Sequence, residues 1–394
     1  MNEIVHTFPL SVQPGIPKIG QTPEGWTRTR LGKLFEVVSR PVKMLDHAEY
    51  DLITVKRSRG GIERRARMKG REISVKSQFE IREGDFVISK RQIVHGACAI
   101  VPAEFSGSIV SNEYSVLRCR PVLDPEYLRW LVHAIYVQQT FFHSSIGVHV
   151  EKMIFKLDEW FRWKIDLPPL AEQQRRAGSL NALHTRLEGL RREKALLSEY
   201  KTGLMQKIFS QDIRFRADDG SAFPDWQTTR LGRICQMKAG QFLQAAEISD
   251  ENTDTNFPCY GGNGLRGFSL KFNKNGQFPL IGRQGALCGN VHFAEGQFYA
   301  TEHAIVAEPA DNVVAKWLFY KLVDMRLVQF ATGLAQPGLA VDTLAYLKLQ
   351  VPHPDEQRKI ADALGAIDAK INSVAAQIEK LDAFRQGLLQ KMFV

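Results

Sequence analysis

Gly203-Leu204-Met205-Gln206-Lys207-Ile208-Phe209 returns 184 residues later as Gly387-Leu388-Leu389-Gln390-Lys391-Met392-Phe393. The same offset of 184 relates two shorter pairs, Leu167-Pro168 to Val351-Pro352 and Glu172-Gln173 to Glu356-Gln357. A fixed offset between similar segments is typical of a duplicated architecture. The chain is therefore predicted to contain two related halves.

Each half also begins with a matching segment. Trp26 is followed by Thr29-Arg30-Leu31-Gly32, and 200 residues later Trp226 is followed by Thr229-Arg230-Leu231-Gly232. The drop in offset from 200 to 184 means that the first globular part is 16 residues longer than the second. Each half thus holds a variable globular stretch followed by a closely matched segment.

The matched segments carry apolar residues at alternating steps of three and four, which is the period of a coiled coil. The predicted seam consists of Leu180, Leu183, Leu187, Leu190, Leu197, Leu204, Ile208, Leu364, Ile367, Ile371, Val374, Ile378, Leu381, Leu388 and Met392. Because a globular part connects the two helices, we expect them to fold back antiparallel on each other. The alternative is two amphipathic helices that each pack into their own domain.

The predicted fold class is α+β, with two globular mixed α/β domains separated by two long helices that form an intramolecular antiparallel coiled coil. The arrangement is duplicated about a pseudo-twofold axis. The predicted segments are an N-terminal arm (1–24), a first globular domain (25–168), a central coiled-coil helix (169–212), a second globular domain (213–352) and a C-terminal coiled-coil helix (353–394).

Each globular domain is predicted to contain one convincing helix, preceded by short strands. Asp124-Pro125 and Asp311 are expected to cap these helices, because Asp is a preferred N-cap residue and Pro is favoured in the first turn. The apolar positions behind the caps are Leu128, Leu131, Val132 and Ile135 in the first helix and Val314, Leu318 and Leu322 in the second.

The formal net charge of +9 favours a polyanionic partner, with DNA or RNA first. The five cysteines are odd in number and form no Cys-x-x-Cys pair, so neither a disulfide framework nor a metal site is expected. The N-terminus lacks the pattern of a signal peptide, and no apolar run approaches the ~20 residues of a membrane helix. We expect a soluble cytoplasmic protein without a membrane partner.

The densest positive charge lies between residues 56 and 71, with Gly60-Gly61 marking a turn in its middle. The basic residues are Lys56, Arg57, Arg59, Arg64, Arg65, Arg67, Lys69 and Arg71, and Glu63 is the single acid among them. A basic hairpin of this kind suits contact with phosphates, because Lys and Arg release the counterions of a nucleic acid. The alternative is a solvated surface loop.

Arg91-Gln92 and Arg283-Gln284 occupy matching places in the two halves, each after a short apolar strand. Arg can pair with guanine O6 and N7, and Gln with adenine N6 and N7, so these residue types suit base reading. Three nearby lysines complete the predicted DNA-binding set, namely Lys90, Lys271 and Lys274.

Residues 260–267 contain a literal Gly-x-Gly-x-x-Gly. A dinucleotide site would need a strand before it and a helix after it, with an acidic residue about twenty positions on. An alternating, strand-like run follows instead, and the acid is missing. We therefore expect a tight glycine loop that carries Asn263 and Arg266 towards a nucleic acid.

Motifs for catalysis are absent from the sequence, which contains no Walker A, His-Glu-x-x-His or Gly-x-Ser-x-Gly pattern. Leu167-Pro168-Pro169-Leu170 lacks the Asn or Asp that adenine methyltransferases place before two prolines. Pro354-Asp355 with Asp368-Ala369-Lys370 spells a bare nuclease pattern. It falls on the predicted helix, whereas nuclease carboxylates converge from a sheet.

The order of these parts resembles the specificity subunit of type I restriction–modification systems. Ile213-Arg214-Phe215 leading to Phe223-Pro224-Asp225-Trp226 looks like that family's entry into a recognition domain. Leu167 to Gln173 and Val351 to Gln357 look like its entry into the helices. The loop 260–267 and Thr301-Glu302-His303-Ala304-Ile305-Val306 are also typical of such domains.

The resemblance implies that each globular domain reads one half of an asymmetric bipartite site on double-stranded DNA. It implies that the helices set the gap and dock two adenine-methylating modification subunits and, where present, two restriction subunits. S-adenosylmethionine, ATP and Mg would then be bound by those partners, and this chain would bind no cofactor and catalyse no step. A bacterial or archaeal, nucleoid-associated protein is implied.

Two other classes stay open at the level of sequence. The first is an enzyme, a methyltransferase or nuclease whose motifs have diverged. The second is a coiled-coil adaptor for nucleic acid or protein without sequence-specific DNA recognition.

Overall fold

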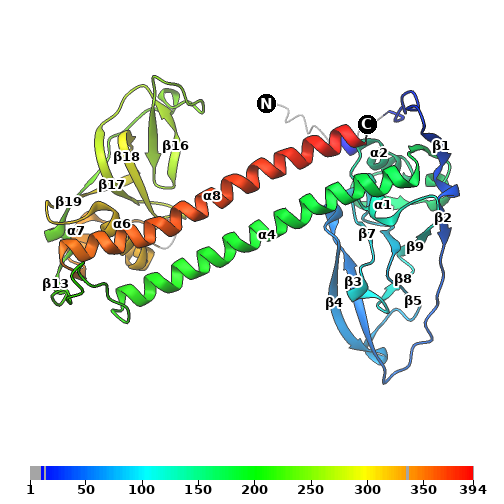
Figure 1. Ribbon diagram of the computed structural model, residues 1–394, viewed down its shortest axis with the longest axis horizontal. Coiled ribbons are helices and arrows are strands. Elements are labelled where there is room, and N and C mark those ends of the chain that lie inside the picture. The colour runs from blue at the N-terminus through cyan, green and yellow to red at the C-terminus, as the bar shows by residue number, and fades with distance from the viewer. Residues whose placement is uncertain (1–9, 13–14, 334–336, 394) are drawn as a thin grey trace. The chain divides into compact units, whose positions relative to one another are not determined.

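The computed structural model describes residues 10–12, 15–333 and 337–393 (Figure 1). The chain divides into two compact units, Met1–Gly189 with Ile378–Val394 and Leu190–Gln377. Each unit contains one globular domain and part of each of two long helices. We call the globular parts domain 1 (residues 27–167) and domain 2 (residues 227–351).

Both domains open and close with the same antiparallel strand pair. In domain 1, β1 (Thr27–Arg30) pairs with β12 (Lys164–Leu167), and in domain 2, β13 (Gln227–Arg230) pairs with β20 (Lys348–Val351). Both turns after the opening strand hold a glycine, because a Cβ on Gly232 would lie 2.9 Å from the side chain of Ala345, and one on Gly32 3.0 Å from Phe161. The repeated Arg-Leu-Gly therefore marks the same turn in both halves.

Domain 1 contains two four-stranded sheets and a helical layer. The first sheet has the order β2 (Phe35–Val37), β9 (Tyr114–Cys119), β6 (Asp85–Ser89), β7 (Cys98–Ile100). The second has the order β4 (Ile62–Lys69), β3 (Glu49–Val55), β8 (Ile109–Ser111), β5 (Gln78–Glu80). The remaining elements are α1 (Pro125–Leu131), α2 (Ile135–His143), α3 (Leu157–Trp160) and the short pair β10 (Ser145–Ile146) and β11 (Ile154–Phe155).

Strand β6 is buried along its whole length because it lies between two cores. Phe86 and Ile88 point to a core around Trp160, and Val87 points to a second core with Ile81 and Val110. Successive side chains of a strand alternate between faces, so a strand covered on both sides is apolar at every inner position. This explains the short apolar run that the sequence shows at residues 86–88.

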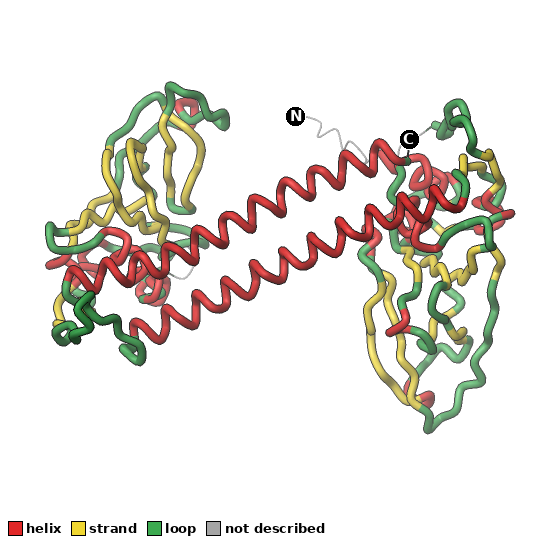
Figure 2. Tube along the Cα trace, in the orientation of Figure 1, coloured by secondary structure: helices red, strands yellow, loops and turns green. Residues whose placement is uncertain are grey.

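Domain 2 contains a single six-stranded sheet, as Figure 2 shows in yellow. Its order is β14 (Cys235–Ala239), β19 (Ala304–Pro309), β17 (Lys274–Gly282), β18 (Val291–Ala300), β15 (Phe257–Gly261), β16 (Gly264–Ser269). Its helices are α5 (Leu231–Ile234), α6 (Ala315–Asp324) and α7 (Val341–Ala345). The first four strands of this sheet follow the same order as the first sheet of domain 1.

The two predicted helix caps have different outcomes. Asp124 caps α1 as expected, since its carboxylate accepts a 2.8 Å hydrogen bond from the Tyr127 N–H. The inclusion of Ile135 is wrong, because α1 ends at Leu131 and Ile135 begins α2. The cap at Asp311 is also wrong. Helix α6 begins after Val314, whose N–H donates to the side-chain oxygen of Gln357.

The long helices are α4 (Leu170–Phe209) and α8 (Pro354–Met392). They run antiparallel within each unit. In the first unit Arg176 donates to the carbonyl of Met392, and in the second unit the Nζ of Lys201 lies 2.6 Å from Asp368. No predicted seam residue is exposed, and Leu187 and Val374 are fully buried.

The ends of the seam also enter the domain cores. Leu180 belongs to the main core of domain 1, whereas Ile208 and Leu364 belong to that of domain 2. The two expectations for the helices are therefore not exclusive. The helices pair with each other, and their ends pack into the globular domains.

A buried glutamine joins each long helix to its domain. Gln173 and Gln357 stand at equivalent places in the first turns of α4 and α8, and both are buried. Each side-chain oxygen accepts a hydrogen bond from a backbone N–H next to the domain's short helix, that of Asp124 or Val314. Each side-chain amide donates to the carbonyl of the proline five residues earlier. The repeated Glu-Gln therefore fixes each long helix to its domain.

Candidate nucleic-acid interface

The loops after β6 and β17 have the same length and share the backbone hydrogen bond that closes them. In domain 1 the Ser89 N–H donates to the Ala97 carbonyl, and in domain 2 the Gly282 N–H donates to the Asn290 carbonyl. Each loop therefore spans seven residues, 90–96 and 283–289. Each ends in a glycine with a positive φ, of 80° at Gly96 and 87° at Gly289. The two loops are structural equivalents.

This register shifts the predicted equivalence of the two Arg-Gln pairs by one residue. The Lys90 N–H donates to the Glu113 carbonyl, just as the Arg283 N–H donates to the His303 carbonyl. Lys90 is therefore equivalent to Arg283, and Arg91 to Gln284. The prediction aligned Arg91 with Arg283 because the residue types are identical. The hydrogen bonds of the sheet determine which positions correspond, and they align Arg91 with Gln284.

In domain 1 the loop residue Arg91 is exposed and forms an ion pair with Glu113. Its Nε lies 2.5 Å from the carboxylate, and this contact raises the pKa of Arg91. The next residue, Gln92, points elsewhere, since its side-chain oxygen accepts a hydrogen bond from Arg57 at 2.8 Å. Of the predicted pair, Arg91 is thus the residue available to a ligand.

The basic stretch forms a hairpin of β3 and β4, as expected, but several of its cations face acids. Arg64 lies 3.2 Å from Asp51, Arg67 lies 3.0 Å from Glu49, and Lys56 lies 3.6 Å from Glu63. Because β3 supplies two of these acids from outside the basic stretch, the sequence pattern did not reveal the pairing. The pairs are exposed, so each contributes little to stability.

Three arginines of this stretch form no ion pair in the described part of the chain, and one of them is internal. Arg59 donates to the Val132 carbonyl at 2.8 Å, and burial lowers its pKa. Its guanidinium ties the hairpin turn to the helical layer, and its predicted contact with DNA stays a prediction. Arg65 and Arg71 are exposed and have no side-chain partner among the described residues.

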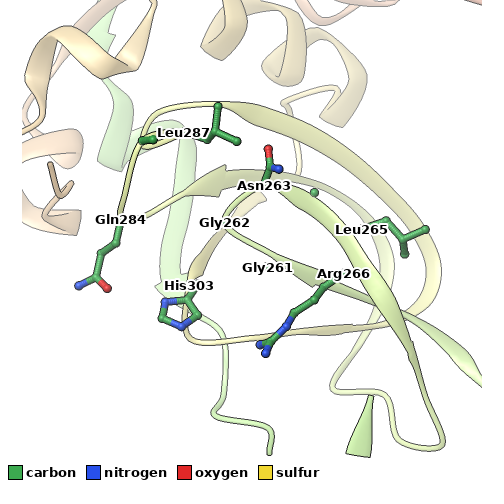
Figure 3. Close-up of a pocket in the computed structure, with 10 residues that line it drawn as sticks. Gly261, Gly262, Asn263, Leu265, Arg266, Gln284, Leu287 and His303 are labelled. Atoms are coloured by element: carbon green, nitrogen blue, oxygen red, sulfur yellow. The ribbon is translucent and has the colours of Figure 1, made fainter. Parts of the chain in front are cut away.

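In domain 2, the loop after β17 and the β15–β16 hairpin line a cleft of about 480 Å³ (Figure 3). Its lining includes Asn263 from the turn between β15 and β16, Leu265 and Arg266 from β16, and Gln284 and Leu287 from the loop after β17. His303, just before β19, completes the lining. The structure thus brings together Asn263, Arg266 and Gln284 of the predicted set.

The glycines of this cleft are required by close packing. A Cβ on Gly264, which has a φ of +84°, would lie 2.8 Å from the His292 ring. A Cβ on Gly282 would lie 2.3 Å from the Gly262 carbonyl oxygen. The Gly-x-Gly-x-x-Gly segment is accordingly a strand–turn–strand hairpin, without the helix that a dinucleotide site needs.

Two predicted lysines lie away from the cleft. Lys271 forms an ion pair with Glu247, and Lys274 forms one with Glu308 at the start of β17. The cleft lies at the other end of that strand, roughly 25–30 Å away at the rise of a β-strand. The predicted set for domain 2 therefore divides between two places.

The sequence did not single out Glu113, and it pointed to His303 only as part of the family-like segment 301–306. The two residues stand at equivalent positions immediately before β9 and β19, beside the two loops. Glu and His share no chemistry that a comparison of the two halves would detect.

Comparison with known proteins shows what the chain is similar to. The type I restriction modification DNA specificity domain matches residues 224–383. The EcoprrI specificity subunit of Escherichia coli is 46% identical over 145 residues, which is 36% of each chain. The MjaVIII specificity subunit of Methanocaldococcus jannaschii is 21% identical over 414 residues, covering 94% of this chain and 92% of that relative.

The chain is thus similar to type I restriction–modification specificity subunits. Solved structures show the same fold. A crystal structure of the S subunit from M. genitalium covers 96% of this chain and 99% of its own, with 18% identity and a TM-score of 0.67. A chain from a structure of type I complex assembly and conformational transition matches with 21% identity and a TM-score of 0.54.

In the part of the chain that the structure describes, no helix is both long and apolar enough to cross a membrane. Within the same residues, no group of three or more His, Cys, Asp or Glu side chains could hold a metal ion.

Proposed function

We propose that this chain is the DNA-reading subunit of a type I complex in which each domain reads one half of an asymmetric bipartite site. The observation that carries the proposal is that the two domains share one arrangement of strands but carry different side chains on the equivalent loops. The strands β2-β9-β6-β7 and β14-β19-β17-β18 repeat, yet the residues on their equivalent loops differ. Related domains with different side chains at one position suit two half-sites of different sequence.

The paired helices are proposed to set the gap between the half-sites. A helix of 40 residues is about 60 Å long at 1.5 Å per residue. Proteins with twofold symmetry read half-sites one helical turn, ~34–36 Å, or a multiple of it apart on one face of the duplex. A helical spacer of fixed length supports a fixed gap, since it cannot stretch.

Positive charge supports the choice of DNA as the ligand. The chain carries a formal charge of +9, and Arg65 and Arg71 on the hairpin and Arg266 in the cleft are exposed with no ion pair in the described part of the chain. Cations of this kind neutralise phosphates and release counterions, which makes binding strong and salt-dependent. These contacts position the protein, whereas base edges carry the sequence information.

Two modification subunits are proposed to dock on the helices and to bring S-adenosylmethionine and the adenine-N6 methylating site. Restriction subunits, where present, would bring ATP and Mg. This chain would itself catalyse no step. Its target would be the cell's own DNA, in the cytoplasm of a bacterium or archaeon. Similarity to type I specificity subunits favours this role over an adaptor without sequence-specific recognition.

The test is a map of methylated bases. The chain is expressed with its modification subunit in a host without DNA methylation, and N6-methyladenine is located by single-molecule sequencing. We expect one split motif with a fixed gap and a methylated adenine in each half. A single unsplit motif would contradict the two-domain reading. No methylation, from an assembled and soluble complex, would contradict the function itself.

A further inference from the structure

The two equivalent loops each place one exposed side chain beside one residue of the neighbouring strand edge. In domain 1 these residues are Arg91 and Glu113, and in domain 2 they are Gln284 and His303. The backbone register makes Arg91 equivalent to Gln284 and Glu113 equivalent to His303. The same pair of positions therefore occurs in both domains, with charged side chains in domain 1 and an amide and an imidazole in domain 2.

We infer that this pair of positions selects a base in each half-site, with Arg91 held for guanine and Gln284 held for adenine. The inference rests on the proposed function and adds the residues that make the two half-sites differ. Arg pairs with guanine O6 and N7, and Gln pairs with adenine N6 and N7.

In domain 1, Glu113 orients the arginine. The Arg91 Nε donates to one carboxylate oxygen of Glu113, and Nη2 lies 3.5 Å from the other. The N–H groups of Nη1 remain free of this contact and point away from it, because the guanidinium is planar. An exposed ion pair of this kind adds little stability. Its effect is to hold a long side chain in one geometry before a base arrives, which lowers the entropy lost on binding.

In domain 2, both residues of the pair line the cleft, together with Asn263 and Leu287 (Figure 3). The Nε2 of His303 lies 3.1 Å from Glu302. The Gln284 side chain is exposed, and its amide N–H and carbonyl groups form no side-chain hydrogen bond among the described residues.

The loop that carries Gln284 is held firmly by its backbone. The Cys288 N–H donates to the Gly285 carbonyl, and the Leu339 N–H donates to the Arg283 carbonyl. The Cys288 thiol contacts the same Arg283 carbonyl at 3.3 Å. In domain 1 the His95 N–H makes the bond equivalent to that of Cys288, to the Gln92 carbonyl. A reading residue on a fixed loop needs no reordering of the backbone on binding.

The remaining cations do not share this arrangement. Arg65 and Arg71 are exposed cations of the basic hairpin and its following turn, which domain 2 lacks. Contacts from such residues to phosphates carry no base information. The pair at 91/113 and 284/303 is repeated in both domains, as a mechanism for choosing one base in each half-site requires.

The test is an exchange of the two pairs in the full complex with its modification subunit, read by mapping N6-methyladenine. Arg91→Gln with Glu113→His gives domain 1 the pair of domain 2, and Gln284→Arg with His303→Glu does the reverse. We expect the first variant to change a guanine of one half-site to adenine or to relax it. The second should change an adenine of the other half-site. The unaffected half and the gap should stay the same.

The matched control is Arg162→Gln with Glu159→His. Arg162 and Glu159 form an exposed ion pair at 2.9 Å in domain 1, remote in sequence from the loop, and the substitutions are the same as at 91 and 113. This control should leave the whole motif unchanged. If the exchange variants also leave a split motif unchanged, the inference is overturned while the proposed function stands. If the wild-type complex methylates no split motif, the proposed function fails first.

A variant that loses methylation is tested by binding. The complex is titrated with duplexes that carry the mapped motif or one base-pair change in the affected half. The wild-type complex should bind the changed duplex roughly tenfold to hundredfold more weakly at the base read by the pair. The exchange variant should lose that discrimination at this base pair alone. Unaltered discrimination would overturn the inference.

Discussion

Domain 1 and domain 2 share a frame but differ in what covers it. Both are closed by the same strand pair and a buried glutamine. Both also contain the same order of four strands, in which a seven-residue loop connects two neighbouring strands. In domain 1 a second, separate sheet carries the basic hairpin, whereas in domain 2 β15 and β16 extend the first sheet and form the cleft. The closing strand pairs and the common strand order are held by backbone hydrogen bonds. The basic hairpin of domain 1 and the cleft of domain 2 present exposed side chains.

The same position can also be stabilised in two ways. Asp85 is fully buried in β6 and bonds to Arg40 and Arg118. The strand register makes Phe278 its equivalent in domain 2. An ion-pair network and an aromatic ring therefore occupy the same point of the frame. The frame specifies where the backbone runs, not which side chains stabilise it.

The largest expected effect is the loss of the buried carboxylate of domain 1. Asp85→Ala should lower the free energy of unfolding by about 3 kcal/mol, because Arg40 and Arg118 would lose their partner inside the domain. Urea titration followed by tryptophan fluorescence measures this. Glu113→Ala is the control within the same domain, and its exposed pair should contribute less than about 1 kcal/mol. Equal effects of the two changes would contradict the assigned network.

The next effect tests whether the two frames are equivalent. Gln173→Ala and Gln357→Ala should each destabilise the chain by about 2 kcal/mol, because each leaves a buried backbone N–H and buried carbonyls without a partner. The measurement is urea-induced loss of circular dichroism. Costs that differ severalfold between the two variants would show that only one long helix depends on this anchor.

A smaller effect concerns pH and domain 1. Burial, together with nearby arginines such as Arg59, lowers the pKa of His133 to about 4. The unfolded chain, with a histidine pKa near 6.5, then binds more protons than the folded one between about pH 6.5 and 4. Stability should therefore fall as the pH falls through this window, by on the order of 1–2 kcal/mol from this residue.

Urea midpoints between pH 4 and 8 check the sign of that effect. Burial also lowers the pKa of His292 in domain 2, so the whole chain should lose stability in acid. The difference between the wild type and His133→Asn isolates the part that belongs to domain 1. A variant with an unchanged acid slope would contradict the role of His133.

The smallest effect separates free cations from paired ones on the hairpin. Arg65→Ala should lower the salt dependence of binding to any duplex by about one unit of slope, as expected for one phosphate contact. Arg67→Ala is the matched control, since Arg67 already faces Glu49 and Asp51. Anisotropy titrations of the complex at several KCl concentrations compare the two. Identical slopes for both variants would mean that the pairing does not affect phosphate contact.

The repeated sequence segments made the fold predictable. The repeats at 184 and 200 residues located both long helices, their seam and the matching starts of the two globular domains. They did so because helix periodicity is a local property that one sequence displays. The reading positions were not predictable to the residue. The register between short strands is a property of the sheet and cannot be seen in the sequence. Because both loops contain Arg followed by Gln, aligning identical residues paired Arg91 with Arg283, whereas the sheet pairs Arg91 with Gln284.

Arg59 illustrates a second limit. Its neighbours in the basic stretch are exposed, but Ser58 and Arg59 have φ values of 56° and 59°. This left-handed turn directs Arg59 to the Val132 carbonyl. The sequence shows a turn at Gly60-Gly61, yet it does not show which arginine turns inward. Likewise, Glu49 and Asp51 pair with the hairpin's arginines from the strand opposite.

The central claim is that two independent readers are held apart by paired helices, and its most direct test is the gap. Four residues are inserted after Ala195 in α4 and four after Ala369 in α8, close to the ion pair between Glu193 and Lys370 that joins the helices. One extra turn of each helix adds about 6 Å. The methylated motif should keep both half-sites and gain about two base pairs of gap. An unchanged gap, or altered half-sites, would contradict the account.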